Sequence, residues 1–192
     1  MIRSTHRSFG KRDFLAWAQG REGHYELKEH HVVMMTGGTK AHARITQGIA
    51  RALDRRLDPE HWSVMTADLA VEIGEDVRYP DVVVELLDND ADALSTSRPV
   101  FLAEVLSPSS LTLDLEVKAR EYMSLPSLEI YLVAAQDEPR VWLWLRSAKD
   151  GSKERRFSQE PLEVSGQNAL VRLDAFGFDL PLSDIYRYVR RS

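Results

Sequence analysis

Residues 100–106 read Val-Phe-Leu-Ala-Glu-Val-Leu, an apolar run that predicts a buried β-strand and contains a single acid, Glu104. A carboxylate inside an apolar strand is costly unless it is paired or coordinates a metal. Glu104 is therefore the first candidate functional residue. The other interpretation, a structural ion pair with Lys118 or Arg120, stays open at this point.

Two neighbouring segments carry polar residues that could join Glu104. The sequence Tyr-Pro-Asp-Val-Val-Val at 79–84 places Asp81 at the start of a β-branched run, which is typical of a strand covered on both faces. The stretch 112–123 predicts a helix on which Asp114, Lys118 and Tyr122, at i, i+4 and i+8, share one face. Taken singly, Pro80-Asp81 also fits a turn, and Lys118 also fits a solvated helix position.

If the two strands are neighbours, Asp81 and Glu104 can converge on one divalent cation. Mg²⁺ takes one or two protein carboxylates and completes its shell with water and substrate phosphate. Lys118, from the following helix, could then orient or deprotonate the attacking water and stabilise charge on a phosphate. We therefore predict a Mg²⁺ (or Mn²⁺) site with Asp81 and Glu104 as ligands and Lys118 as third catalytic residue.

The remaining segments predict an α/β fold, because helices and strands are interspersed along the chain. A short helix is predicted over 11–19, a hairpin over 25–35 with its turn at 28–30, and a long helix over 40–57 with Thr39 as N-cap. The other expected strands cover 62–73, 79–86, 128–133 and 141–145, with an acidic loop at 87–98 and a turn at Asp150-Gly151. This order favours a mixed central β-sheet flanked by helices.

Composition restricts the class of protein. The 192 residues fit one domain spanning 1–192, and 43% hydrophobic with 29% charged residues is ordinary globular usage. Without cysteine, disulfides and thiolate metal sites are excluded. No apolar run approaches the ~20 residues that span a bilayer, and no signal peptide is visible, so we expect a cytoplasmic protein with no membrane partner. The net charge of -5 argues mildly against a protein that coats nucleic acid, although a basic groove can be local.

These motifs resemble the Uma family of restriction-endonuclease-like proteins, within the PD-(D/E)XK nuclease superfamily. The resemblance covers nearly the whole chain. Its most specific part is Glu-Val-Leu-Ser-Pro-Ser-Ser at 104–110 with Asp114 and Lys118 behind it. The other matching segments are 14–17, 25–27, 34–42, 79–84, 128–133 and 180–185.

The resemblance implies a restriction-endonuclease-like core, a metal held by Asp81 and Glu104, and hydrolysis of phosphodiester bonds in nucleic acid, with DNA as the expected substrate of an endonuclease. The lysine that normally stands two residues after the Glu is replaced here by Leu106, so the resemblance implies that Lys118 substitutes for it. The sequence at 28–31, Lys-Glu-His-His, replaces an Asp-Gly-Glu of many relatives, which leaves Glu29 or His31 as stand-ins for an acidic helper.

Further residues have two interpretations each. Asp68 and His42 match family positions; Asp68 could be another acidic ligand or a turn residue, and His42 could meet a phosphate or be structural. The clusters Arg51, Arg55, Arg56 and Lys153, Arg155, Arg156 could follow a phosphate backbone or form ordinary solvated surface.

Two other functions remain open. The fold could be a non-catalytic DNA-binding or protein-interaction module with a vestigial metal site, or a hydrolase of another phosphodiester. We also expect a homodimer, because Tyr131, Trp142 and Trp144 supply more aromatic surface than one small sheet obviously needs.

Overall fold

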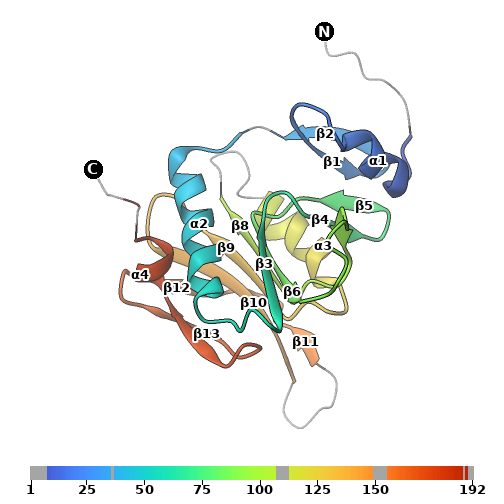
Figure 1. Cartoon of the computed structure of the whole chain (residues 1–192). Coiled ribbons are helices and arrows are strands. Elements are labelled where there is room, and N and C mark those ends of the chain that lie inside the picture. The colour runs from blue at the N-terminus through green and yellow to red at the C-terminus, as the bar shows by residue number, and fades with distance from the viewer. Residues whose placement is uncertain (1–7, 36, 107–112, 149–154, 188, 190–192) are drawn as a thin grey trace.

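The computed structural model describes residues 8–35, 37–106, 113–148, 155–187 and 189. Their strands form a seven-stranded sheet, a five-stranded sheet and one separate hairpin (Figure 1). The predicted turn at Asp150-Gly151 and the predicted cation Lys153 lie outside the described residues. No helix in the described part of the chain is long and apolar enough to cross a membrane.

The central sheet has the strand order β11-β10-β9-β8-β6-β3, and β12 pairs with β10 as well. Its neighbours are antiparallel except for β8 and β9, which are parallel. The bounds are β3 Trp62–Thr66, β6 Val82–Leu86, β8 Phe101–Val105, β9 Ile130–Ala134, β10 Arg140–Ala148, β11 Arg155–Phe157 and β12 Leu162–Ser165. The predicted mixed sheet is confirmed.

Helices cover both faces of this sheet, because successive side chains of each strand point to opposite sides. On β8, Phe101, Ala103 and Val105 pack in the cluster that contains Ile45 and Ile49 of helix α2 (Lys40–Asp54). Leu102 alternates with them and packs in the opposite cluster. That second cluster contains Tyr122 of helix α3 (Ala119–Met123). Glu104 therefore belongs to the face that α3 covers.

The five-stranded sheet has the order β2-β1-β5-β4-β7 and carries helix α1. Leu27 and Val77 from this sheet pack with Phe14 and Leu15 of the helix. The bounds are α1 Lys11–Ala18, β1 His24–Lys28, β2 His31–Met35, β4 Ala70–Ile73, β5 Asp76–Arg78 and β7 Ser95–Thr96. The hairpin predicted over 25–35 is confirmed, with its turn at Glu29 and His30.

Three element predictions need correction. The expected strand over 62–73 is two strands in different sheets, because the backbone turns at Ala67, whose φ is 31°. The expected loop 87–98 contains the short strand β7, and strand β5 was not predicted. The helix expected over 112–123 begins as a π-helix, η1 (Leu113–Lys118), and continues as α3.

The C-terminal part packs against α2. The hairpin β13 (Leu170–Leu173) and β14 (Phe178–Pro181) leads into helix α4 (Leu182–Ile185). Gly48 makes this packing possible, because a Cβ at this position would lie only 2.1 Å from the carbonyl oxygen of Ile185. The close approach fixes α2, and with it the residues at its N-terminus.

Candidate active site

Asp81 and Glu104 stand opposite each other at one end of two neighbouring strands. Asp81 directly precedes β6, and the antiparallel register pairs Val82 with Ala103, so the next position pairs Asp81 with Glu104. Directly opposed residues of an antiparallel pair point to the same face, with Cβ atoms roughly 4.5–5.5 Å apart. The register therefore starts the two side chains on the same face of the sheet, and the Asp81 carboxylate extends from there to His42 at the N-terminus of α2.

The Asp81 carboxylate is held by two donors. Its Oδ2 accepts a hydrogen bond of 2.7 Å from the backbone N–H of Val105, and Nε2 of His42 lies 3.1 Å from the same oxygen. His42 stands in the first turn of α2, where Thr39 acts as N-cap and accepts a 3.1 Å hydrogen bond from the His42 backbone N–H. The predicted cap at Thr39 is confirmed, and it places the imidazole beside Asp81.

The Glu104 carboxylate is buried and receives two donors from the helix opposite. Its Oε1 accepts from Nζ of Lys118 at 2.9 Å and from the hydroxyl of Tyr122 at 2.8 Å. Glu104 and Lys118 are each only 5% exposed. Burial, and then the nearby Glu104 charge, raise the pKa of Tyr122 well above its ordinary value, so its phenol stays protonated and donates. Lys118 therefore supplies the positive charge that a buried carboxylate requires.

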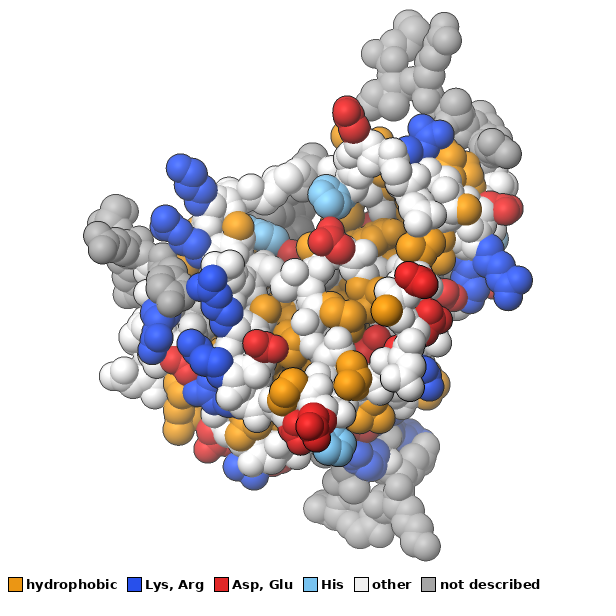
Figure 2. Space-filling view, in the orientation of Figure 1, with side chains coloured by type: hydrophobic (Ala, Val, Ile, Leu, Met, Phe, Trp, Pro, Cys, Tyr) orange, Lys and Arg blue, Asp and Glu red, His pale blue; other side chains and the backbone are white. Residues whose placement is uncertain are grey.

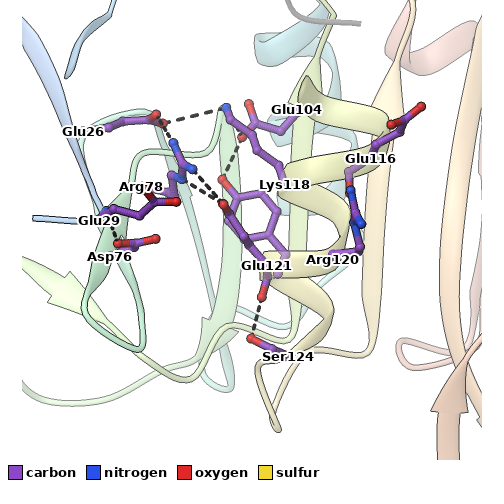
Figure 3. A network of polar contacts seen from close by, with 11 residues as sticks. Glu26, Glu29, Asp76, Arg78, Glu104, Glu116, Lys118, Arg120, Glu121 and Ser124 are labelled. Carbon is purple, nitrogen blue, oxygen red and sulfur yellow. Dashed lines mark hydrogen bonds and ion pairs between the residues drawn. The ribbon is translucent and has the colours of Figure 1, made fainter. Parts of the chain in front are cut away.

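Two residues of the five-stranded sheet, Glu26 and Arg78, join this network of charges to the central sheet (Figure 3). Oε1 of Glu26, on β1, lies 3.8 Å from Nζ of Lys118, and its Oε2 accepts a 2.7 Å hydrogen bond from Arg78 on β5. Arg78 also binds both carboxylate oxygens of Glu121 on α3, at 2.8–3.0 Å. The pKa of Arg78 is raised: burial alone would lower it, but the charges of Glu26 and Glu121 outweigh burial. We call Glu26, Arg78, Glu121 and Lys118 the inter-sheet charge cluster.

Three acids named from the sequence lie elsewhere or cannot be placed. Asp68 lies in the turn between β3 and β4 and lines a cavity of about 210 Å³ with His24 and Tyr79. Asp114 is part of η1, but its side chain lies outside the described residues. Glu29 lies at the hairpin turn, where its backbone N–H donates to Asp76 at 2.7 Å.

The possible helpers Glu29 and His31 both lie at or beside the hairpin turn. His31 lies next to the hairpin turn, and its Nδ1 contacts the carbonyl oxygen of Glu29 at 2.7 Å. The acid beside Lys118 is Glu26, three residues earlier on β1. Its signal in the sequence was the one used for Glu104, a carboxylate between the apolar neighbours Tyr25 and Leu27.

Gln136 is a further residue that sequence reasoning did not select. Its Nε2 donates to the carbonyl oxygen of Leu106, and its Oε1 accepts a 2.5 Å hydrogen bond from the Thr39 hydroxyl. The carboxamide thus ties the end of β8 to the N-terminus of α2. It links the two elements that carry Glu104 and His42.

The donor set fits a cation that needs few protein ligands. The described residues contain no group of three or more His, Asp or Glu side chains arranged to hold a metal. Asp81 and Glu104 are the two carboxylates that the strand register places nearest each other. This matches the chemistry of Mg²⁺, which keeps several waters and binds through one or two carboxylates. A closed cage of the kind typical of structural zinc is not present among the described residues.

Comparison with known proteins agrees with this architecture. A family model described as "Uma2: Putative restriction endonuclease" matches residues 12–181. Two uncharacterized proteins of Synechocystis sp. are 28% and 27% identical over 58% and 69% of this chain, and these matches span 66% and 71% of the two relatives. A crystal structure from Anabaena variabilis, described as a putative nuclease belonging to DUF820, superposes with a TM-score of 0.74 at 16% identity, covering 93% of this chain and 98% of that one.

Proposed function

The chain belongs to the Uma2 family of restriction-endonuclease-like proteins, and we propose that it is a divalent-metal-dependent nuclease that hydrolyses phosphodiester bonds in DNA. The observation that carries the proposal is the position of Asp81 opposite Glu104 with Lys118 at 2.9 Å from the Glu104 carboxylate. These are three residues from two strands and a helix, each held by its own contacts. The pair Glu104–Lys118 is buried, whereas an ordinary ion pair at the protein surface is not.

In this proposal, Asp81 and Glu104 hold Mg²⁺ or Mn²⁺. A cation held there would polarise the scissile phosphate and lower the pKa of a water bound to it. Without a cation, two converging carboxylates repel each other, and Lys118 offsets that repulsion through its contact with Glu104. His42 orients Asp81 and lies close enough to meet a substrate phosphate or water.

The test is cleavage of labelled DNA with Mg²⁺ or Mn²⁺ by the wild type and by Asp81→Asn. The asparagine keeps an oxygen that can accept from the Val105 N–H, so the variant should fold while losing cleavage. Asp88→Asn is the matched control, because Asp88 is an exposed acid in the loop after β6. It should cleave as the wild type does. Equal cleavage by Asp81→Asn and wild type would contradict the metal-site assignment.

Lys118→Ala separates metal binding from chemistry. We expect it to cleave slowly but still bind the cation in calorimetry, because its ammonium acts on water or phosphate. Removing Lys118 leaves Glu104 buried without its cationic partner, so added Mg²⁺ should raise the Tm of this variant more than that of the wild type. If the wild type binds neither Mg²⁺ nor Mn²⁺ at millimolar concentration, even with DNA present, the enzyme proposal fails and a vestigial binding module replaces it.

The homodimer stays a prediction, but the structure accounts for the aromatic rings on which it was based. Tyr131 and Trp144 are buried and stack with ring centroids 5.4 Å apart. Trp142 donates from its ring N–H to Glu163 at 3.1 Å. Light scattering at micromolar concentration tests the prediction directly. The cytoplasmic location likewise stays a prediction.

A further inference from the structure

Helix α2 carries a straight row of cations on its solvent face. Lys40, Arg44, Arg51 and Arg55 are all exposed. With 3.6 residues per turn, their positions fall within about 60° of one another around the helix axis. We call these four residues the α2 ridge. At 1.5 Å per residue, it extends about 22 Å.

The charge of this ridge is unusual for a solvated helix face. Exposed helices commonly alternate acids and bases at i,i+4, which stabilises them. Residues 40–56 instead contain five Lys or Arg against one acid, Asp54. The pairs Lys40–Arg44 and Arg51–Arg55 are like charges at i,i+4, each costing roughly 0.2–0.5 kcal/mol. These cations are concentrated on one helix although the chain as a whole carries a net charge of -5.

The ridge begins at the candidate active site. His42, in the first turn of α2, contacts Asp81 at 3.1 Å, so the ridge starts beside the site and runs away from it along the helix. Figure 2 shows Lys and Arg side chains gathered in a column over the region that α2 occupies in Figure 1. Ile45, Ile49 and Gly48 anchor the other side of the helix against the core and α4. The row of cations is thus rigidly placed relative to the carboxylates.

The opposite end of β6 has the reverse charge. The segment 85–92, which begins with the last two residues of β6, holds four acids and no Lys or Arg. A polyanion is therefore repelled by this acidic segment and attracted by the α2 ridge. The exposed face of α2 carries no Phe, Tyr or Trp on which unpaired bases could stack, which favours a duplex backbone over a single strand.

We propose that the α2 ridge binds the phosphate backbone of the duplex DNA whose scissile phosphate reaches Asp81 and Glu104. This inference rests on the proposed function for the identity of the polyanion, and it adds the surface and direction of binding. Phosphates along one strand of the duplex are spaced 3.4 Å along the axis, so about six lie within the length of the ridge. Four cations over that length can each contact one of them.

The test is fluorescence anisotropy of a labelled DNA duplex over a range of salt concentrations, without divalent cations, so that binding is measured apart from cleavage. The ridge variant is Arg44→Gln/Arg51→Gln/Arg55→Gln. The control is Arg12→Gln/Arg21→Gln/Arg172→Gln, which removes the same charge from exposed arginines elsewhere. Circular dichroism checks that both variants are folded.

We expect the ridge variant to lower the slope of log K against log salt concentration by about 2.7, since each phosphate contact contributes about 0.9. At 0.1 M salt this corresponds to binding weaker by up to about 500-fold. The control variant should keep the slope of the wild type. Equal loss in the two variants, or no loss in the ridge variant, would overturn the ridge as the binding surface.

The outcome separates this inference from the nuclease proposal. A wild type that binds duplex DNA through the ridge but cleaves nothing refutes the nuclease proposal and leaves the ridge in place. A wild type that cleaves DNA, with a ridge variant that has unchanged KM and salt slope, refutes the ridge and leaves the nuclease in place. If both hold, the ridge variant should show a raised KM with kcat close to that of the wild type.

Discussion

Replacing Arg78 with methionine should destabilise the fold strongly, because this arginine is the centre of the inter-sheet charge cluster. Arg78 is 2% exposed and donates to Glu26 at 2.7 Å and to both oxygens of Glu121. Methionine fills similar volume but removes the cation that contacts Glu121, and it leaves Glu26 with only Lys118 at 3.8 Å. Glu26 is itself buried. The loss therefore comes from stranded charge more than from lost packing.

Breaking a buried ion pair by removing one partner costs roughly 3–5 kcal/mol. For a chain of this size each kcal/mol lowers Tm by roughly 2–4 °C, so Arg78→Met should melt about 6–20 °C below the wild type. Arg172→Met is the matched control. Arg172 also contacts two acids, Asp174 and Asp179, but it is 58% exposed, so its loss should leave the stability close to that of the wild type. Urea unfolding followed by circular dichroism measures both.

A second variant identifies the cause. Adding Glu26→Gln to Arg78→Met removes one of the two stranded carboxylates, so the double variant should be more stable than Arg78→Met alone. Equal stability of Arg78→Met and Arg172→Met would refute the assignment of a buried, stabilising cluster. A double variant less stable than Arg78→Met would refute stranded charge as the mechanism.

Three further changes test other parts of the fold. Gly48→Ala should destabilise by at least about 1–3 kcal/mol, because its Cβ meets the Ile185 carbonyl oxygen, and thermal melting checks this. Glu29→Asn should stabilise by up to about 1 kcal/mol in urea unfolding, because Glu29 has φ 48° and asparagine tolerates that conformation better. Burial alone raises the pKa of Glu72, but its hydrogen bonds, above all from Lys11, hold it below the ordinary 4.5. The stability that this contact adds is thus present above about pH 4.5 and lost as pH falls through the lowered pKa, and a pH series of melts should show Lys11→Met converging with the wild type in acid.

The elements that could be predicted were those with a strong local signal. Helix α2 combines an N-cap at Thr39 with apolar residues at helical spacing, and the β-branched run 82–84 is unambiguous. The break at Ala67 could not be predicted, because no glycine or proline marks a residue that tertiary contacts hold at φ 31°. Likewise β7 is two residues long and exists because Ala70 and Val71 offer a parallel partner.

Part of the candidate site could be predicted, because one of its residues gives a clear signal in its own segment of sequence. Glu104 is conspicuous because an acid in an apolar strand needs a partner, and the strand order then places Asp81 opposite it. Glu26 carries the same local signal, but only the pairing of β1 with β5 brings it to Arg78, and nothing local in the sequence encodes that pairing. The sequence alone therefore suggests Glu29 or His31, which lie at and beside the turn of the same hairpin, as the acidic helper.

Lys118 reaches the Glu104 carboxylate from a different element than the lysine of the related pattern does. In the related pattern, the lysine stands two residues after the glutamate, on the same strand face. Here that position is Leu106, which packs in the cluster under α3. The ammonium instead comes from the last residue of η1, and Tyr122, one turn later, donates to the same oxygen of Glu104. In the site that we propose, the positive charge therefore reaches the carboxylate from the helix instead of from the strand. Lys118 is the last residue of a π-helical segment, and π-helical turns are frequent at functional sites.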